Sequence, residues 1–236
     1  MVRKKSSYKK LIFALIVLFI LTGVIGYVMK TKLIKSINNT ALPAPVYKSQ
    51  TSIEEALAGR RSVRVFKNEP ITLLQVSQLL WAAQGITSKN GFRTAPSAGA
   101  IYPLEIYIVS KDVIGLPAGL YHYVPADHTL ELLREGNKQN ALMIPALIQS
   151  GIQDDKADIV IMAVYKRMTV KYGSRGDRFV HMEAGHAAEN IYLQAVSLGL
   201  GTVAIGSFDD AAVKSVLNLP RDQEPLYIMP IGKPAK

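Results

Sequence analysis

The sequence contains no cysteine among its 236 residues and only four histidines. Without thiols, the chain cannot form disulfides, thiolate nucleophiles, cysteine-bound iron–sulfur clusters or a lipid-modified cysteine anchor. The histidines also lack the cysteine partners and the spacing of a common zinc site. They are His122, His128, His181 and His186. Thiol chemistry and a structural zinc site of this kind are therefore excluded.

Acidic side chains are missing from the first 50 residues, which hold nine Lys and Arg. Residues 51–236 hold the other 19 basic residues and all 18 acidic ones, so their formal charge is only +1. The net charge of +10 therefore comes almost entirely from the N-terminal part. Because a nucleic-acid-binding domain would carry a basic face of its own, we expect no nucleic acid partner.

Charge is absent from one long apolar run, Leu11 to Met29, which has 19 residues. As an α-helix this run would measure roughly 30 Å, the thickness of the hydrocarbon core of a bilayer. Signal-peptide cores are shorter, at about 7–15 residues, so the run predicts a retained transmembrane anchor after a basic flank at 1–10. Two alternatives stay open: a cleaved signal peptide, with small residues at 41–44 that permit late cleavage, and a buried core helix.

The basic residues on either side of the run predict its orientation. Five of them precede it and three follow it: Arg3, Lys4, Lys5, Lys9 and Lys10, then Lys30, Lys32 and Lys35. The more basic flank of a membrane helix usually stays in the cytoplasm. We therefore expect a single-pass membrane protein whose soluble domain is extracytoplasmic rather than cytoplasmic.

Residues 30–50 mix Lys, Asn and Pro without a helical period, which predicts a linker. The soluble domain is expected over 51–236, where apolar periodicity and cap residues predict both helices and strands. Hairpin-like pairs stand beside alternating elements, so the expected fold is α+β, a mixed sheet flanked by helices. The expected helices are 51–59, 72–83, 138–149, 179–198 and 209–217, and the expected strands are 104–109, 119–124, 129–133, 157–165, 202–205 and 226–231.

Three arginines and a serine lie within five residues directly after the first expected helix, in Arg60-Arg61-Ser62-Val63-Arg64. Arginine presents a fork of donors that matches phosphate oxygens, and serine adds another donor. In an extended segment alternate residues point to one side, so Arg60, Ser62 and Arg64 would share a face. The segment is either a phosphate site or a solvated charge run, and by itself it does not separate the two.

Small residues dominate the segment Thr94 to Pro103, TAPSAGAIYP, directly before an expected strand. Small side chains let the backbone approach a flat ligand closely. Main-chain N–H groups can then bond to ring carbonyls or phosphates. The alternative is an ordinary turn between a helix and a strand.

Two further segments carry patterns that suggest a ligand. In LGLGTVAIGSFD, Leu198 to Asp209, the first glycines end a helix rather than begin one, so the dinucleotide-binding fingerprint is not present. Glu183 and His186 share a helix face at a spacing of three residues. They form half of a di-iron motif whose second half is missing. We therefore expect no metal site and a buried, hydrogen-bonded Glu183–His186 pair.

Taken in this order, the segments resemble the nitroreductase superfamily. The closest likeness is to its SagB-type dehydrogenase branch, whose best-known members oxidise azoline rings in ribosomal peptides. The likeness covers roughly residues 52–234, and it depends on several phrases in the correct order rather than on one. These are RRSVR (60–64), PSAGAIYP (96–103), KYGSRG (171–176), MEAGHAAENIYL (182–193), LGLGTVAIGSFD (198–209) and IGK (231–233).

The resemblance implies a homodimer with FMN at its interface. Arg60, Ser62 and Arg64, with Arg61 beside them and Lys233 near the C-terminus, would hold the phosphate and ribityl chain. The turn Pro96, Ser97, Ala98, Gly99 and Ala100 would face the flavin of a shared site, and Gly206 and Ser207 would lie near N5 and O4 of the ring. Many nitroreductases carry Asn where Ala100 stands here, and this departure favours the SagB-type branch.

By the same resemblance the chain is an FMN-dependent oxidoreductase that transfers hydride through flavin N5. Its substrate would be a small electrophile such as a nitroaromatic or quinone, or a peptide as in the SagB-type branch. The electron donor would be NAD(P)H or a membrane quinol. No catalytic side chain is assigned, although Lys171 and Tyr172 are candidates for an acid or base. The alternative is a flavin-binding electron-transfer or scaffold subunit at the membrane, without turnover of its own.

Overall fold

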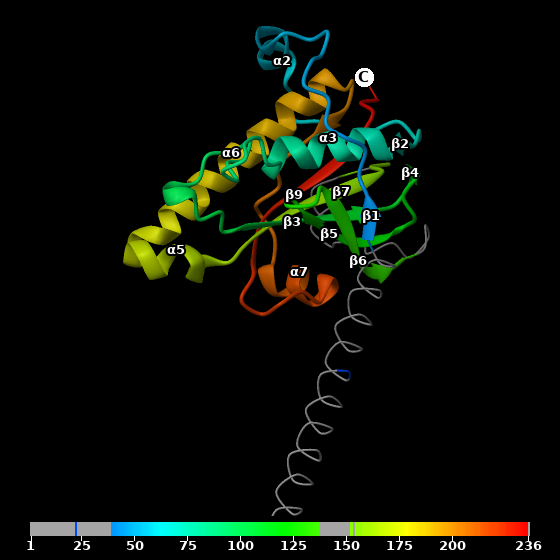
Figure 1. Cartoon of the computed structure of the whole chain (residues 1–236). Coiled ribbons are helices and arrows are strands. Elements are labelled where there is room, and N and C mark those ends of the chain that lie inside the picture. Colours follow the sequence, from blue (N-terminus) through cyan, green and yellow to red (C-terminus); the bar gives the residue numbers. More distant parts are fainter. Residues whose placement is uncertain (1–21, 23–38, 137–151, 153, 236) are drawn as a thin grey trace, which may run out of the picture. The chain divides into compact units, whose positions relative to one another are not determined.

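The computed structural model describes Thr22, residues 39–136, Ile152 and residues 154–235 (Figure 1). By its internal contacts the chain divides into two compact units, Met1–Asn39 and Thr40–Lys236. The helix expected at 138–149 lies outside the described residues.

The expected membrane placement is corrected by the structure. Crossing a bilayer takes about 20 predominantly apolar residues in one helix, and no helix in the described part of the chain meets this requirement. The longest described helix, α6 (Gly176–Ser197), carries Asp177, Arg178, Glu183 and Glu189. The single-pass localisation with an extracytoplasmic domain is therefore withdrawn. The apolar run at 11–29 itself lies outside the described residues, apart from Thr22.

Seven strands form one sheet in the order β1-β6-β5-β3-β7-β9-β8. Every pair whose register is described within this sheet is antiparallel, whereas a small separate pair, β2–β4, is parallel. The α+β class is thus confirmed, with a main sheet that is more uniformly antiparallel than expected. The strands are β1 (Asn39–Ala41), β2 (Ile71–Thr72), β3 (Leu104–Ser110), β4 (Val113–Ile114), β5 (Gly119–Val124), β6 (Thr129–Glu135), β7 (Ala157–Ala163), β8 (Gly201–Thr202) and β9 (Glu224–Gly232).

Helices cover both faces of the sheet, which explains why β7 is apolar along its whole length. Successive side chains of a strand point to opposite faces. Ile159 and Ile161 of β7 therefore pack into the core under α3 (Leu73–Gln84) and α6, while Val160 and Met162 pack into the core under α7 (Asp210–Leu217). Figure 1 shows α3 (Leu73–Gln84) and α6 on one face and α7 (Asp210–Leu217) on the other.

Local signals set the starts of the helices. Ser52 and Glu55 form a capping box at the start of α2 (Ile53–Gly59). Thr72 and Gln75 form the same reciprocal pair at the start of α3. Such boxes satisfy backbone N–H groups that a helix end otherwise leaves without partners. One helix, α5 (Tyr165–Tyr172), was not expected, because it begins at the last residue of the apolar strand phrase 157–165 and no side-chain cap marks its start.

The residues directly before α2 pack against the helical layer. The Gln78 side chain accepts a hydrogen bond from the Val46 N–H at 2.8 Å and donates one to the Val46 carbonyl at 2.9 Å. The Tyr47 ring packs edge-on against Trp81, with 5.5 Å between ring centroids. Residues 46–53, called the strap below, are thus tied to α3.

Candidate functional site

The arginine-rich segment lies in an extended path between β8 and the C-terminal residues. The Val63 N–H donates to the Thr202 carbonyl at 2.9 Å, and the Lys67 N–H donates to the Lys233 carbonyl at 2.8 Å. Further along, the Ala235 N–H donates to the Val65 carbonyl at 3.1 Å. Three segments that are distant in sequence, around residues 60–67, 201–202 and 233–235, are therefore joined by main-chain hydrogen bonds.

The four cations expected near a phosphate have different surroundings. The Arg60 guanidinium lies 5.1 Å from the centre of the Tyr192 ring. Arg61 instead donates to the carbonyls of Ala58 and Arg60, at 3.0 and 2.7 Å. Arg64 is exposed.

Lys233, the fourth cation, forms an ion pair with Glu69 at 2.8 Å. This ion pair holds the pKa of Glu69 below its usual value. Among the described residues no ion pair engages the guanidiniums of Arg60, Arg61 or Arg64. Ser62 is exposed, and its main chain forms an isolated parallel β-bridge with Thr202. The buried Oγ1 of Thr202 has no hydrogen-bond partner in the described part of the protein. Unpaired guanidiniums beside hydroxyl groups suit a phosphate ester, so the donor set fits the phosphate end of FMN.

The chain from Thr202 leads directly to the residues expected near the flavin ring. Gly206 and Ser207 are exposed and follow Thr202 by four and five residues, so Gly206 lies at most about 14 Å from it along an extended chain. The path is fixed by Tyr192, whose hydroxyl accepts a hydrogen bond from the Ala204 N–H at 2.7 Å. Tyr192 thus touches both the Arg60 side chain and this loop, a role that no sequence pattern had indicated.

The small-residue turn has an unusual backbone. Gly99 has φ 64°, and the non-glycine residues Ala100 and Tyr102 have φ 54° and 55°. Left-handed conformations cost roughly 1–2 kcal/mol for residues with a Cβ atom, and they concentrate at functional sites. The turn is held from within, because the Ser97 hydroxyl accepts a hydrogen bond from the Tyr102 N–H at 2.9 Å.

Two candidate proton-transfer residues lie against this turn. A Cβ atom built on Gly99 would lie 2.6 Å from the Tyr172 hydroxyl and 2.7 Å from Lys171 Nζ. Both side chains come from the end of α5, whereas Gly99 belongs to the short helix η1 (Ala98–Ala100). The Tyr172 ring also packs edge-on against Phe179, with 5.0 Å between centroids. A side chain at position 99 would therefore require the Lys171 amine and the Tyr172 phenol to shift.

A buried carboxyl lies beneath the turn. Glu183 is only 1% exposed and accepts a long hydrogen bond, 3.5 Å, from Gln84, which itself accepts one from Arg93 at 2.9 Å. Burial raises the pKa of Glu183 to about 7, and contacts with Ser97, Gln84 and Arg93 oppose this rise only in part. Burial likewise lowers the pKa of Arg93.

His186 is exposed, so the expected buried Glu183–His186 pair is wrong. Within the described residues no group of three or more potential metal ligands is arranged to hold an ion.

Within one chain the predicted site residues fall into two separate groups. The first contains the arginine segment, Gly206, Ser207 and Lys233. The second contains the turn at 96–100 with Lys171 and Tyr172. Arg60 of the first group contacts Tyr192 of α6, and Ser97 of the second contacts Glu183 of the same helix. Tyr192 and Glu183 are nine residues apart, which corresponds to about 13 Å along a helix.

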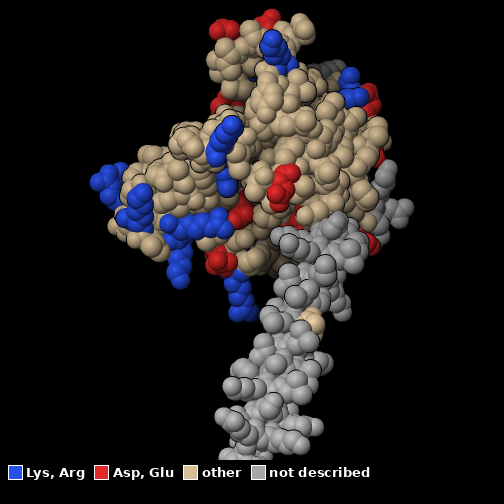
Figure 2. Space-filling view, viewed as in Figure 1, with Lys and Arg blue, Asp and Glu red and all other residues tan. Residues whose placement is uncertain are grey.

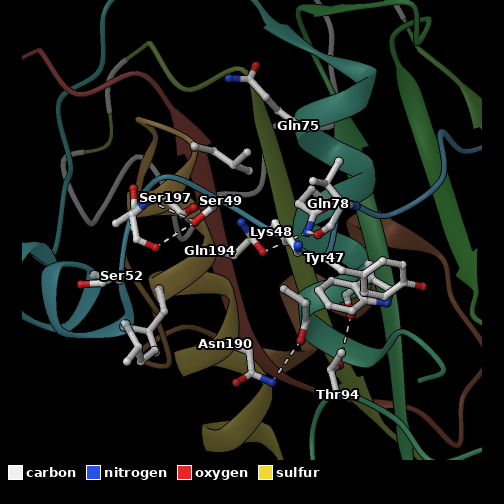
Figure 3. A pocket seen from close by; sticks show the side chains of 18 of the residues that line it. Tyr47, Lys48, Ser49, Ser52, Gln75, Gln78, Thr94, Asn190, Gln194 and Ser197 are labelled. Atoms are coloured by element: carbon white, nitrogen blue, oxygen red, sulfur yellow. Dashed lines mark hydrogen bonds between the residues drawn. The ribbon is translucent and has the colours of Figure 1, made fainter. Parts of the chain in front are cut away.

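A cavity of about 580 Å³ opens between the strap, α2, α3 and α6 (Figure 3). Its polar lining is largely neutral and includes the carboxamide residues Gln75 and Gln78 of α3 and Asn190 and Gln194 of α6. The Gln75 carboxamide is turned toward the start of α3, where it accepts a hydrogen bond from the Thr72 N–H at 2.9 Å. None of the residues predicted to bind FMN lines it. No sequence pattern predicts this cavity, because it depends on the strap lying across two helices.

Comparison with known proteins assigns the family. The family model described as Nitroreductase family matches residues 57–233. The chain belongs to the nitroreductase family. It is 44% identical over 184 residues to MJ1384 of Methanocaldococcus jannaschii, described as a nitroreductase, covering 78% of this chain and 92% of the relative. A crystal structure from Ralstonia eutropha described as a nitroreductase is 34% identical, with a TM-score of 0.75, and the match covers 84% of this chain and 90% of that one.

The relation to the SagB-type branch is also confirmed. The microcin B17-processing protein McbC of Escherichia coli is 29% identical over 150 residues, which covers 59% of this chain and 54% of McbC. This nitroreductase-family oxidoreductase is thus related both to proteins described as nitroreductases and to a microcin B17-processing protein. Proteins of the family generally use flavin cofactors.

Proposed function

We propose that this protein is an FMN-dependent oxidoreductase of the SagB-type or nitroreductase-like kind. The observation that carries the proposal is the extended arginine segment. Its guanidiniums have no carboxylate partner among the described residues, and it is hydrogen-bonded to β8, which ends four residues before Gly206. When bound, FMN accepts a hydride at N5 and passes it on. The protein then has to bind and orient the cofactor and exclude water.

Each residue of the first group has a role in this proposal. Arg60, Ser62 and Arg64 donate to the phosphate, and Lys233 adds a positive charge after release from Glu69. Gly206 and Ser207 offer main-chain N–H groups to the ring edge. Arg61 is not included, because its guanidinium is already bonded to two carbonyl groups at the end of α2.

A homodimer would bring the two groups of residues together. In a two-fold dimer the same surfaces meet reciprocally, so the turn of one chain can complete the site begun by the arginine segment of the other. Apolar side chains are available for such a contact: Ile53, Leu57, Leu74 and Met182 on α2, α3 and α6 are 52–56% exposed. Their exposure on the helical layer supports the dimer.

Lys171 and Tyr172 are the residues we propose as acid or base. Their terminal atoms reach the turn at Gly99, where a substrate facing the flavin would lie. A phenol or an ammonium group there can donate a proton to a substrate heteroatom, and its conjugate base can accept one.

The substrate proposal follows the two kinds of relatives. One candidate is a small electrophile, as the nitroreductase descriptions indicate, with NAD(P)H as hydride donor. The other is a peptide, because McbC is a peptide-processing protein. An exposed Val170, at 79%, beside the candidate proton-transfer residues would contact either substrate at the mouth of the site.

The first test is the visible absorption spectrum of the purified full-length protein, followed by anaerobic addition of NADPH or NADH. We expect flavin bands in the visible spectrum, and bleaching of these bands by a nicotinamide. Release of the chromophore by heat and its identification as FMN would complete the assignment. A colourless protein that takes up no added FMN would contradict the proposal. Stable colour without bleaching would leave the cofactor assignment intact and reject the nicotinamide as donor.

A further inference from the structure

Tyr102, two residues after the turn of the proposed site, is held at each of its polar groups. Its N–H donates to the Ser97 hydroxyl at 2.9 Å, its hydroxyl accepts from the Arg93 N–H at 3.2 Å, and its carbonyl accepts from the Arg167 guanidinium at 3.2 Å. The Arg93 guanidinium also lies 4.4 Å from the centre of the Tyr102 ring. Tyr102 has φ 55°, and such a backbone persists only where the surroundings over-determine it. These contacts supply that constraint.

One of these contacts comes from a different layer of the fold. Arg167 lies on α5, and its guanidinium also forms an ion pair with Glu105 of β3. One side chain therefore joins a helix, the sheet and the turn. The main chain adds a second connection, because the Val164 N–H donates to the Pro103 carbonyl at 2.9 Å. The start of α5 is thus attached to the end of the turn by two hydrogen bonds.

The Glu105 carboxylate is held on both of its oxygens. Its Oε2 lies 2.7 Å from His122 Nε2, which leaves Oε1 for the Arg167 guanidinium. The centre of the His122 ring lies in turn 4.8 Å from that of the Tyr107 ring. Burial alone would raise the pKa of Glu105, but its hydrogen bonds to His122 and Arg167 together hold the pKa below its usual value. Glu105 is therefore an ionised and oriented partner for Arg167.

Arg167 and Lys171 are four residues apart on α5, so they lie on one face of the helix. At the end of this helix, Lys171 Nζ and the Tyr172 hydroxyl lie 2.7 and 2.6 Å from the position of a Cβ atom on Gly99. The helix has only eight residues, and the step from Arg167 to Lys171 is about 6 Å along its axis. An anchor at Arg167 therefore determines where the last two residues of α5 meet the turn.

Arg167 differs from the other cations of this part of the molecule. Figure 2 shows Lys and Arg side chains gathered over α5 and the start of α6. Lys166, directly before Arg167, is exposed and forms no ion pair among the described residues. Lys166 is therefore a matched control on the same helix.

We propose that Arg167, held by Glu105, is a positioning residue that sets Lys171 and Tyr172 against the turn. This inference rests on the proposed function for the proton-transfer role of those two residues. Arginine suits the task because its planar guanidinium donates to a carboxylate and a carbonyl in a fixed geometry, whereas a lysine ammonium is a single point charge. A purely structural ion pair would stabilise α5 but would not act through Lys171 and Tyr172.

Hydrogen–deuterium exchange of the full-length protein tests the connection. Arg167→Met removes both bonds of the guanidinium and keeps a long side chain. We expect exchange in residues 96–103 to become about tenfold faster, because the Ala100 and Tyr102 N–H groups are bonded within the turn. Lys166→Met, which removes one charge from the same helix, should exchange like the wild type. Equal exchange in all three proteins would overturn the proposal.

Single-turnover kinetics test what the connection does. The photoreduced protein is mixed anaerobically with nitrobenzene, and reoxidation of the flavin is followed in the visible spectrum. We expect Arg167→Met to slow reoxidation by about 10- to 100-fold at unchanged flavin content, and Arg167→Lys to recover at most part of this loss. In a Lys171→Met, Tyr172→Phe background the substitution of Arg167 should have little further effect, because no proton-transfer pair remains to be positioned. Lys166→Met should react like the wild type.

The same slowing by Arg167→Met in both backgrounds would overturn the proposal and would indicate a structural ion pair. Thermal unfolding checks that each variant folds. Glu105→Gln acts on the other partner, since it removes the charge and keeps the shape, and it should give a smaller change of the same kind. Failure of the proposed function would appear as a colourless protein. Equal exchange, or equal slowing in both backgrounds, in a protein with bound flavin would overturn this inference alone.

Discussion

Val63 packs directly against Gly201. A Cβ atom at Gly201 would lie 2.7 Å from Val63 Cγ2, closer than real side-chain contacts allow. The arginine segment can therefore lie beside β8 only because residue 201 has no side chain. This contact holds the proposed phosphate-binding segment against β8, and only residues 203–205 separate β8 from the proposed ring-binding residues Gly206 and Ser207.

Loss of the unpaired guanidiniums should weaken FMN binding. We expect Arg60→Ala and Arg64→Ala each to cost about 1.5–3 kcal/mol, or about 10- to 150-fold in the dissociation constant, because each removes charge-assisted hydrogen bonds to the phosphate. Fluorescence titration of the apoprotein with FMN measures the change. Arg61→Ala is the matched control, since Arg61 bonds to carbonyl groups of its own chain. Equal losses for all three variants would contradict the proposed division of roles.

A methyl group at Gly99 should disturb the turn through contact as well as through backbone strain. Gly99→Ala introduces a left-handed alanine, at roughly 1 kcal/mol, and brings its Cβ against Lys171 and Tyr172. Gly91→Ala is a matched control, because Gly91 has φ 80° but no atom within 4 Å of the added carbon. We expect turnover to fall in Gly99→Ala while Gly91→Ala loses only stability. Similar turnover in the two variants would show that the contact has no functional role.

Removal of the phenolic hydroxyl at Tyr172 should slow turnover with little effect on folding. Tyr172→Phe keeps the edge-on contact with Phe179 and removes the proposed proton donor, a change that typically lowers rates by about 10²–10⁴-fold. Steady-state kinetics across pH would measure kcat, with flavin content checked in parallel. Tyr165→Phe, at the first residue of the same helix, should retain nearly full activity. Unchanged kcat in Tyr172→Phe would leave Lys171 as the remaining candidate.

The buried Glu183 should make stability depend on pH. Burial raises its pKa in the folded state to about 7, from a usual value of 4.5, so between these values the folded protein binds a proton that the unfolded chain has released. The contribution of Glu183 to the free energy of unfolding is therefore highest below about pH 4.5. This contribution falls by about 3 kcal/mol as the pH rises to about 7. Glu183→Gln, which resembles the protonated form, should flatten the dependence measured by urea unfolding. An unchanged pH profile in the variant would show that Glu183 is not its source.

The sequence predicted elements whose signals are local. The capping residues Ser52 and Thr72 set helix starts, and the apolar phrase around Ile159 to Met162 indicated a strand buried on both faces. The start of α5 at Tyr165 was not predicted, because an apolar run has no periodicity that would mark where a strand ends and a helix begins. The three-residue strand β1 was missed because it exists only through pairing in the sheet.

The candidate site was predictable as a set of residues but not as an arrangement. Side-chain chemistry indicated Arg60, Ser62 and Arg64, and the family likeness supplied the turn. The left-handed backbone at Ala100 and Tyr102, the approach of Lys171 to Gly99, and the separation of the two groups along α6 all depend on tertiary contacts. No pattern in one sequence encodes such contacts.

The edge-on contact between Tyr47 and Trp81 gives the molecule a built-in optical reporter. Trp81 is the sole tryptophan of the 236 residues, so all indole emission of the protein originates at the strap and the cavity beneath it. Release of the strap would bring water to this ring and shift the emission to longer wavelength, while filling of the cavity would change its intensity. Events at this surface can therefore be followed in unlabelled protein, independently of the flavin.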